Sequence, residues 1–170
     1  MIRTPWINRT FPAIEDSGLL PNIIERLEGT PSRLEEKVRN HRHPINNKPL
    51  PDKWSIKQEI GHLIDLEALG QERVRQIVAG LPELKAADMS NQQTHSAHHD
   101  AQLFEELLSR FRSERKKLVN SFRSLSDADL EKVSFHPRLK RPMKAVDLAY
   151  FIAEHDDHHL AQISFLLQQQ

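Results

Sequence analysis

Four long segments in which apolar residues recur every three or four positions limit this chain to a helical fold. The segments cover about residues 19–41, 55–79, 100–125 and 144–167. Prolines gather between the segments, and Gly29, Thr30 and Pro31 interrupt the first one. No stretch alternates between apolar and polar residues as a half-buried strand would. The pattern predicts an all-α four-helix bundle.

The length of 170 residues is that of one ordinary domain. We therefore expect a single domain over residues 1–170, with an irregular arm over about residues 1–18. Residues 81–99 are polar and without periodicity, which predicts a long connection. Ser55 is suited to cap the start of the second helix, and Gly80 follows its end. The basic segment 135–142 is bounded by prolines and is expected to be a loop.

Composition excludes several classes of protein. The 24 Lys and Arg residues balance the 24 Asp and Glu residues, so the chain lacks the cationic surplus of a nucleic-acid binder. The chain has no cysteine, which excludes disulfides, zinc–thiolate sites, iron–sulfur clusters and a thiol nucleophile. No segment reaches the roughly 20 apolar residues of a membrane span, and the N-terminus does not resemble a signal peptide. By elimination, we expect a cytoplasmic protein that acts on a small molecule rather than on a membrane.

Histidine is abundant, with ten residues, and two histidines fall on the inner face of the last helix. His155 and His159 are four residues apart, so their side chains can point at a common atom. They occupy positions where a bundle would normally place leucine, and buried imidazoles need a polar partner. His158 is expected to face solvent or the flank, although pairing of His155 with His158 is an alternative geometry. Asp156 and Asp157 are expected to face outward.

His62 lies on the inner face of the second helix, where it could complete a site with His155 and His159. Three neutral imidazoles from two helices would hold a divalent metal and leave coordination positions open, as in catalytic sites. All-nitrogen ligands favour zinc or nickel. The alternative is that the three histidines lie at the core edge and bond to backbone carbonyls. That alternative is favoured for His62 alone, whereas metal binding is favoured for the pair and for the three together.

The remaining acidic and histidine residues are weaker candidates. Asp65 and Glu59 could accept hydrogen bonds from ligating imidazoles, or they could be solvated charges. His95, His98 and His99 lie in the polar connection, where solvated side chains are expected; the alternative is that this loop folds over a metal. His41, His43 and His136 lie near prolines and are expected at the surface.

These residues resemble the DinB-like (YfiT-type) family of metal-dependent enzymes. The resemblance rests on the segment Asp52–Ser55, on Glu59, His62, Asp65 and Glu67, and on residues 155–159 with Gln162 and Ile163. It implies a four-helix bundle with a long crossover connection and a divalent metal, nickel or zinc, held by His62, His155 and His159. It also implies a homodimer. Characterised branches include S-transferases and an isomerase that use low-molecular-weight thiols.

Three functions are compatible with such a site. The first is a thiol-dependent S-transferase acting on small electrophiles, in which the metal lowers the pKa of a thiol. The sulfur must then come from a thiol cosubstrate. Basic residues are possible anchors for its carboxylates, but the sequence assigns them no role: Arg73, Arg138, Lys140 and Arg141.

The second function is metal-dependent hydrolysis of an amide or ester, for which Glu59, Asp65 or His158 could transfer protons. The third is a non-catalytic metal-binding stress protein, whose site would be coordinatively closed.

Overall fold

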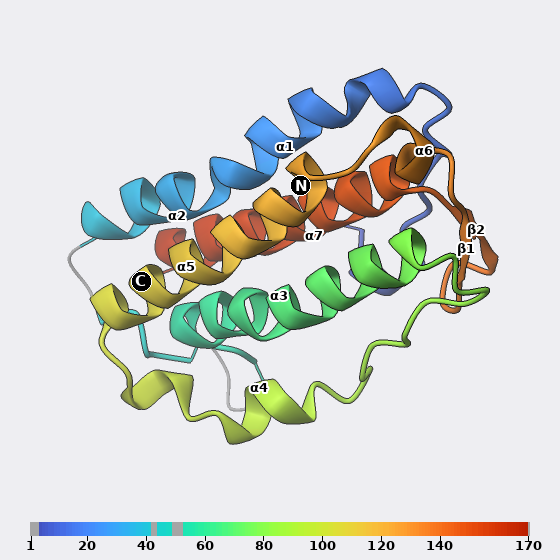
Figure 1. Ribbon diagram of the computed structural model, residues 1–170. Coiled ribbons are helices and arrows are strands. Elements are labelled where there is room, and N and C mark those ends of the chain that lie inside the picture. The colour runs from blue at the N-terminus through green and yellow to red at the C-terminus, as the bar shows by residue number, and fades with distance from the viewer. Residues whose placement is uncertain (1–3, 42–43, 49–52, 170) are drawn as a thin grey trace.

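The computed structural model describes residues 4–41, 44–48 and 53–169, and long helices make up most of them (Figure 1). The longer helices are α1 (Leu20–Glu28), α2 (Thr30–Arg39), α3 (Ile56–Val78), α5 (Phe104–Arg123) and α7 (Ala145–Gln168). The shorter elements are α4 (Gln92–Ser96), α6 (Asp127–Leu130), the strands β1 (Ser134–His136) and β2 (Arg141–Met143), and 3-10 turns at Trp6–Asn8, Ser17–Leu19 and His99–Ala101. In the described residues, no helix is both long enough and apolar enough to cross a membrane.

The bundle consists of α1 with α2, α3, α5 and α7, and its connections are unequal. Figure 1 shows that α3 and α5 run in the same direction, whereas α7 runs opposite to both. The chain must therefore return along the whole bundle between α3 and α5, and it does so outside α3 through α4. The predicted four-helix bundle with a long crossover is confirmed.

Local sequence explains where the helices begin and end. The Ser55 hydroxyl accepts a hydrogen bond from the Gln58 backbone N–H, and the Gln58 side chain accepts one from the Ser55 N–H. Gly80 adopts φ +67°, which lets the chain leave α3 sharply. The predicted break in the first segment falls at Gly29, between α1 and α2. The third long helix begins at Phe104 rather than near residue 100, because residues 99–101 form a 3-10 turn.

The segment 135–142 differs from its prediction. It contains part of an antiparallel β-hairpin in which Ser134 pairs with Met143 and His136 pairs with Arg141. Strands of three residues are too short to show an alternating pattern, so they could not be predicted from the sequence. The hairpin lies at the end of the bundle where α3 ends and α7 begins (Figure 1).

The interior contains two apolar clusters with polar side chains between them. One cluster, near the hairpin, includes Val74, Phe122 and Leu148. The other, near the start of α3, includes Ile60 and Phe111. Between the clusters along α3, α5 and α7 lie buried polar side chains that we call the polar layer: His62, Glu67, Arg115, His155, Asp156 and His159.

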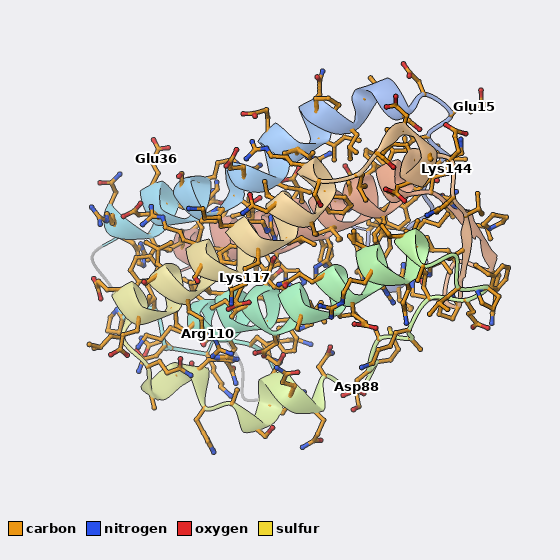
Figure 2. All side chains as sticks on the ribbon, viewed as in Figure 1. Glu15, Glu36, Asp88, Arg110, Lys117 and Lys144 are labelled. Atoms are coloured by element: carbon orange, nitrogen blue, oxygen red, sulfur yellow. The ribbon has the colours of Figure 1, made fainter. Side chains whose placement is uncertain are left out.

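Most of the charged side chains that the structure describes lie at the surface. Figure 2 shows Glu15, Glu36 and Asp88 at the outer edge of the molecule, pointing away from the bundle. The polar side chains of the interior are therefore separate from the charges at the surface. Because burial of a polar group requires a partner, we ask what each of them contacts.

Candidate metal centre

His155 and His159 of α7 are buried and turn their imidazoles toward each other. Their Nε2 atoms are 3.1 Å apart, and their ring centroids are 4.4 Å apart. The spacing of four residues places both side chains on one helix face, as predicted. Two nitrogens that bind one zinc ion at about 2.0–2.1 Å lie roughly 3.0–3.4 Å apart, so this separation suits a shared cation.

His62 of α3 completes the group. Its ring centroid is 5.3 Å from that of His155 and 4.9 Å from that of His159. Each of the three histidines offers a nitrogen atom within 4.8 Å of the other two. We call these three residues the histidine triad. Within the ranges that the structure describes, no fourth His, Asp or Glu joins the group.

Hydrogen bonds fix which nitrogen of His159 and of His62 faces the triad. His159 Nδ1 lies 2.5 Å from Glu59 Oε2, so it carries the proton and leaves the Nε2 lone pair facing His155. His62 Nδ1 lies 3.1 Å from Thr94 Oγ1, and that hydroxyl donates to Asp65 Oδ2 at 3.0 Å. Thr94 must therefore accept the His62 Nδ1–H, which leaves the lone pair of the neutral ring on His62 Nε2.

A further histidine supports Asp65 from the crossover. His99 Nε2 lies 2.9 Å from Asp65 Oδ2, and the His99 side chain is fully buried. The prediction that His99 is a solvated loop residue is therefore wrong. Thr94 was not predicted from sequence at all, because nothing in a polar connection shows which side chain will fold against α3.

Two of the three imidazoles, those of His62 and His155, are neutral at physiological pH. Burial, followed by the neighbouring His159, lowers the pKa of His62 to about 3. Burial, followed by His159 and His62, lowers the pKa of His155 well below its usual range. Neutral imidazoles are the form that binds metal ions, so no proton has to be removed from these two ligands at pH 7.

Two tryptophans flank the triad. The Trp54 ring lies 4.8 Å from the His62 ring and stacks at 6.3 Å on the His159 ring. The Trp6 ring from the N-terminal arm lies 4.9 Å from His155 and 5.6 Å from His158. His158 is half-buried beside the triad and not within it.

The rest of the polar layer is an ion cluster around Arg115. The guanidinium of Arg115 pairs with Glu67 at 2.5 Å and with Asp156, while Thr30 also donates to Asp156. The prediction that Asp156 faces outward is wrong, because Asp156 is buried against α5. Asp157, by contrast, lies near the surface and pairs with Arg26 and Arg33.

The second oxygen of Glu67 in this cluster has no partner among the described residues. Burial raises the pKa of Glu67 to about 7, although Arg115 opposes the shift.

The other histidines are scattered. His95 and His98 are exposed, as predicted, while His41 is half-buried. His136 was predicted at the surface, but it is buried where the hairpin meets Phe151, so that prediction is wrong. His43 lies outside the described residues.

A pocket of about 360 Å³ opens beside the triad. His62, His155, Arg73 and Arg138 all line it. Apolar side chains of α3, α5 and α7 form much of the wall: Leu66, Leu69, Leu118, Phe151 and Ile152.

The amino-acid sequence of this chain is similar to those of known proteins. The family model of the DinB superfamily matches residues 26–163. The uncharacterized protein YuaE of Bacillus subtilis (strain 168) is 25% identical over 131 residues, which are 70% of this chain and 80% of YuaE.

Two solved structures share the architecture. YfiT from Bacillus subtilis, described as a probable metal-dependent hydrolase with an unusual four-helix bundle topology, matches with a TM-score of 0.74 and 17% identity, covering 95% of this chain and 93% of YfiT. The mycothiol-dependent maleylpyruvate isomerase matches with a TM-score of 0.67 and 10% identity over 85% of this chain. This chain spans 60% of the length of the isomerase chain.

Proposed function

The chain belongs to the DinB superfamily, and from that premise we propose that His62, His155 and His159 bind one divalent cation, nickel or zinc, for catalysis. The observation that carries this proposal is the convergence of three buried imidazoles, with the Nε2 atoms of two of them 3.1 Å apart. Nitrogen ligands suit nickel and zinc and disfavour magnesium and calcium. Three protein ligands beside an accessible pocket are typical of catalytic rather than structural metal sites.

The reaction that we propose is the transfer of a thiol to a small electrophile. A bound divalent cation would lower the pKa of a thiol, so that a thiolate forms at neutral pH. The chain has no cysteine, so the thiol is a cosubstrate. Its sulfur forms a bond to the electrophilic carbon, the leaving group departs with its bonding electron pair, and the thiol proton is released to solvent or to the leaving group.

The residues of the chain position this reaction. Glu59 and Thr94 hold the rings of His159 and His62 in their ligating orientation. These bonds make Glu59, and Asp65 behind Thr94, orienting groups rather than proton acceptors for the substrate. His158 lies beside the triad and is the candidate for proton transfer. The apolar wall of the pocket would exclude water from the thiolate.

Metal-dependent hydrolysis of an amide or ester is the second candidate. It is favoured by the description of YfiT, the structural relative that covers most of this chain, as a probable metal-dependent hydrolase. A purely structural metal site is disfavoured by the pocket beside the triad, since structural sites are closed by a fourth ligand.

Metal content is the first test. Purified protein should contain close to one equivalent of nickel or zinc by mass spectrometry, and the His155→Ala variant should contain little. The exposed His95→Ala is the matched control and should retain the metal. Equal metal content in the wild type and in His155→Ala would remove the proposed centre.

Activity assays distinguish thiol transfer from hydrolysis of an ester or amide. The metal-loaded protein is mixed with an electrophile such as monobromobimane and with a series of thiols, and separately with esters and amides. Transfer predicts a rate that depends on the thiol and is lost in His155→Ala. Thiol-independent cleavage of an ester or amide by the same centre would instead establish hydrolysis.

A further inference from the structure

The pocket contains two arginines without carboxylate partners. Arg73 of α3 is 5% exposed, and its Nε donates to the Lys85 carbonyl at 2.9 Å. Arg138, in the turn of the hairpin, is half-buried over the rings of Trp6 and Phe151, at 5.1 and 5.5 Å. Among the residues that the structure describes, neither guanidinium forms an ion pair. Arg115, the other deeply buried arginine, pairs with two carboxylates.

A buried cation without a counter-ion is costly, so it calls for an explanation. Burial, followed by Arg138, lowers the pKa of Arg73 to about 10. The two guanidinium groups thus repel each other across the pocket, and no protein carboxylate in the described chain relieves that repulsion. The acidic residues that line the pocket are already engaged. Glu67 and Asp156 bind Arg115, and Asp88 accepts hydrogen bonds from Ser90 and Gln92.

His136 adds a third donor at the same place. It is 1% exposed, and its Nδ1 accepts the Leu139 backbone N–H at 3.2 Å. The proton of the neutral ring is therefore on Nε2, and Nε2 is buried without a partner in the described part of the chain. His136 also lines the pocket. Buried polar groups without partners are rare in folded proteins, and they are expected where a ligand supplies the missing partner.

We propose that Arg73, Arg138 and the Nε2–H of His136 bind the carboxylate of a small molecule whose other end reaches the histidine triad. Guanidinium groups bind carboxylates through two parallel hydrogen bonds, which gives this recognition its strength and direction. The ligand is an anion with an apolar body, because much of the pocket wall is formed by apolar side chains. The inference rests on the proposed function, since it assigns the class of substrate that the metal centre acts on.

Calorimetric titration with two probes of equal shape tests the proposal. The probes are 4-phenylbutyrate and its neutral amide, 4-phenylbutanamide. The carboxylate should bind the metal-loaded wild type about tenfold more tightly than the amide. Arg138→Gln should bind both probes within about threefold of each other, and Arg138→Lys should fall between, because it keeps the charge but loses the two-pronged geometry.

Matched variants control for charge and folding. Arg110→Gln removes an equal charge from an exposed position on α5 and should keep the preference for the carboxylate. Arg73→Gln should lose the preference as Arg138→Gln does, and circular dichroism checks that it folds. Equal affinities of the wild type for the two probes would overturn the proposal. So would an undiminished preference in folded Arg138→Gln.

The titration is repeated in chelator-treated protein and in His155→Ala. The preference for the carboxylate should persist in both, because the arginines and not the cation create it. If it disappears with the metal, the carboxylate binds the cation and the proposal fails. If instead the wild type binds no metal, or the wild type and His155→Ala contain equal amounts, the proposed function fails while the anion site can still be measured.

A second comparison identifies which molecule carries the carboxylate. 6-Mercaptohexanoate and 6-mercaptohexanol are titrated into metal-loaded wild type and Arg138→Gln. A loss of affinity in Arg138→Gln that is confined to 6-mercaptohexanoate assigns the carboxylate to the thiol. If the two thiols bind alike while 4-phenylbutyrate retains its preference, the carboxylate belongs to the electrophile.

Discussion

Thr94 connects the His62 and Asp65 side chains of α3 to the crossover. Its hydroxyl accepts from His62 Nδ1 and donates to Asp65 Oδ2, so one oxygen serves two buried groups. Valine has nearly the same shape but neither function. In Thr94→Val, the His62 N–H would lose its acceptor, and the ring could turn away from the triad.

We expect Thr94→Val to bind zinc or nickel about 10- to 100-fold more weakly than the wild type, with unchanged helix content. Competition with a chromophoric chelator measures the affinity. Thr10→Val makes the same substitution at an exposed position and should leave the affinity unchanged. An unaltered affinity in Thr94→Val would show that His62 does not depend on this bond.

The individual residues of the candidate metal centre differ in how well the sequence could predict them. The four-residue spacing on one helix predicted His155 and His159 as candidate metal ligands. The position of His62 on the inner face of another helix predicted it as the third. Glu59 was a candidate because it lies on the same helix as His62. Thr94 could not be predicted, and Arg138 was named only as one of four possible anchors without a role, because such roles depend on contacts between segments that are far apart in the chain.

Among the elements, α3 and the crossover are held together at a point where α3 has no side chain. A Cβ atom added to Gly61 would lie 2.1 Å from His99 Cδ2 and 2.2 Å from His99 Cγ. The His99 ring therefore rests directly on the helix backbone, which allows its Nε2 to reach Asp65. Only glycine permits this approach.

Gly61→Ala should destabilise the protein by about 1–3 kcal/mol, because overpacking outweighs the higher helix propensity of alanine. Urea denaturation measures the loss. In a His99→Ala background, the ring is absent, and the same substitution should become neutral or stabilising. Destabilisation of similar size in both backgrounds would mean that the clash with His99 is not its cause.

The elements were predicted with unequal success for physical reasons. The capped ends of α3 and the break at Gly29 agree with the sequence pattern, because caps and prolines act locally. The hairpin and the helix α4 were missed, because they are short and are stabilised by contacts with the bundle rather than by their own periodicity.

For the whole molecule, buried neutral histidines make stability depend on pH. Burial, followed by Arg73 and Arg138, lowers the pKa of His136 to about 4, whereas a histidine in the unfolded chain titrates near 6.5. Between these two values the unfolded chain holds a proton that the folded protein lacks. The stability that His136 contributes is therefore complete above about pH 6.5 and falls as the pH decreases toward 4.

We expect His136→Gln to lose less stability than the wild type between pH 6.5 and 4.5, by up to about 1.4 kcal/mol per pH unit. Urea denaturation of chelator-treated proteins at several pH values measures the slopes. Comparing the two proteins cancels the titration of groups that they share, such as Glu67. His95→Gln, at an exposed position, should have the wild-type slope. Identical slopes in wild type and His136→Gln would contradict a depressed pKa at His136.

The overall architecture was the most predictable level. The four apolar segments specify a bundle, and the resemblance to the DinB-like family specified its crossover. The polar layer was only partly visible in the sequence, since Arg115 looks like any other charged residue of an amphipathic helix. Its burial depends on Glu67 and Asp156, which come from two other helices. The homodimer that the resemblance implies stays a prediction.

The parallel course of α3 and α5 also sets the order in which a newly made chain can assemble. Glu59 and His159, which are hydrogen-bonded in the finished molecule, are separated by 100 residues. During synthesis, the apolar faces of the earlier helices stay uncovered until α7 has been made, because α7 follows the other helices of the bundle in the chain. Closing such a long loop is entropically costly and slows folding. Until α7 has been made, the nascent chain therefore exposes the apolar faces of its earlier helices, and chaperones can bind to them.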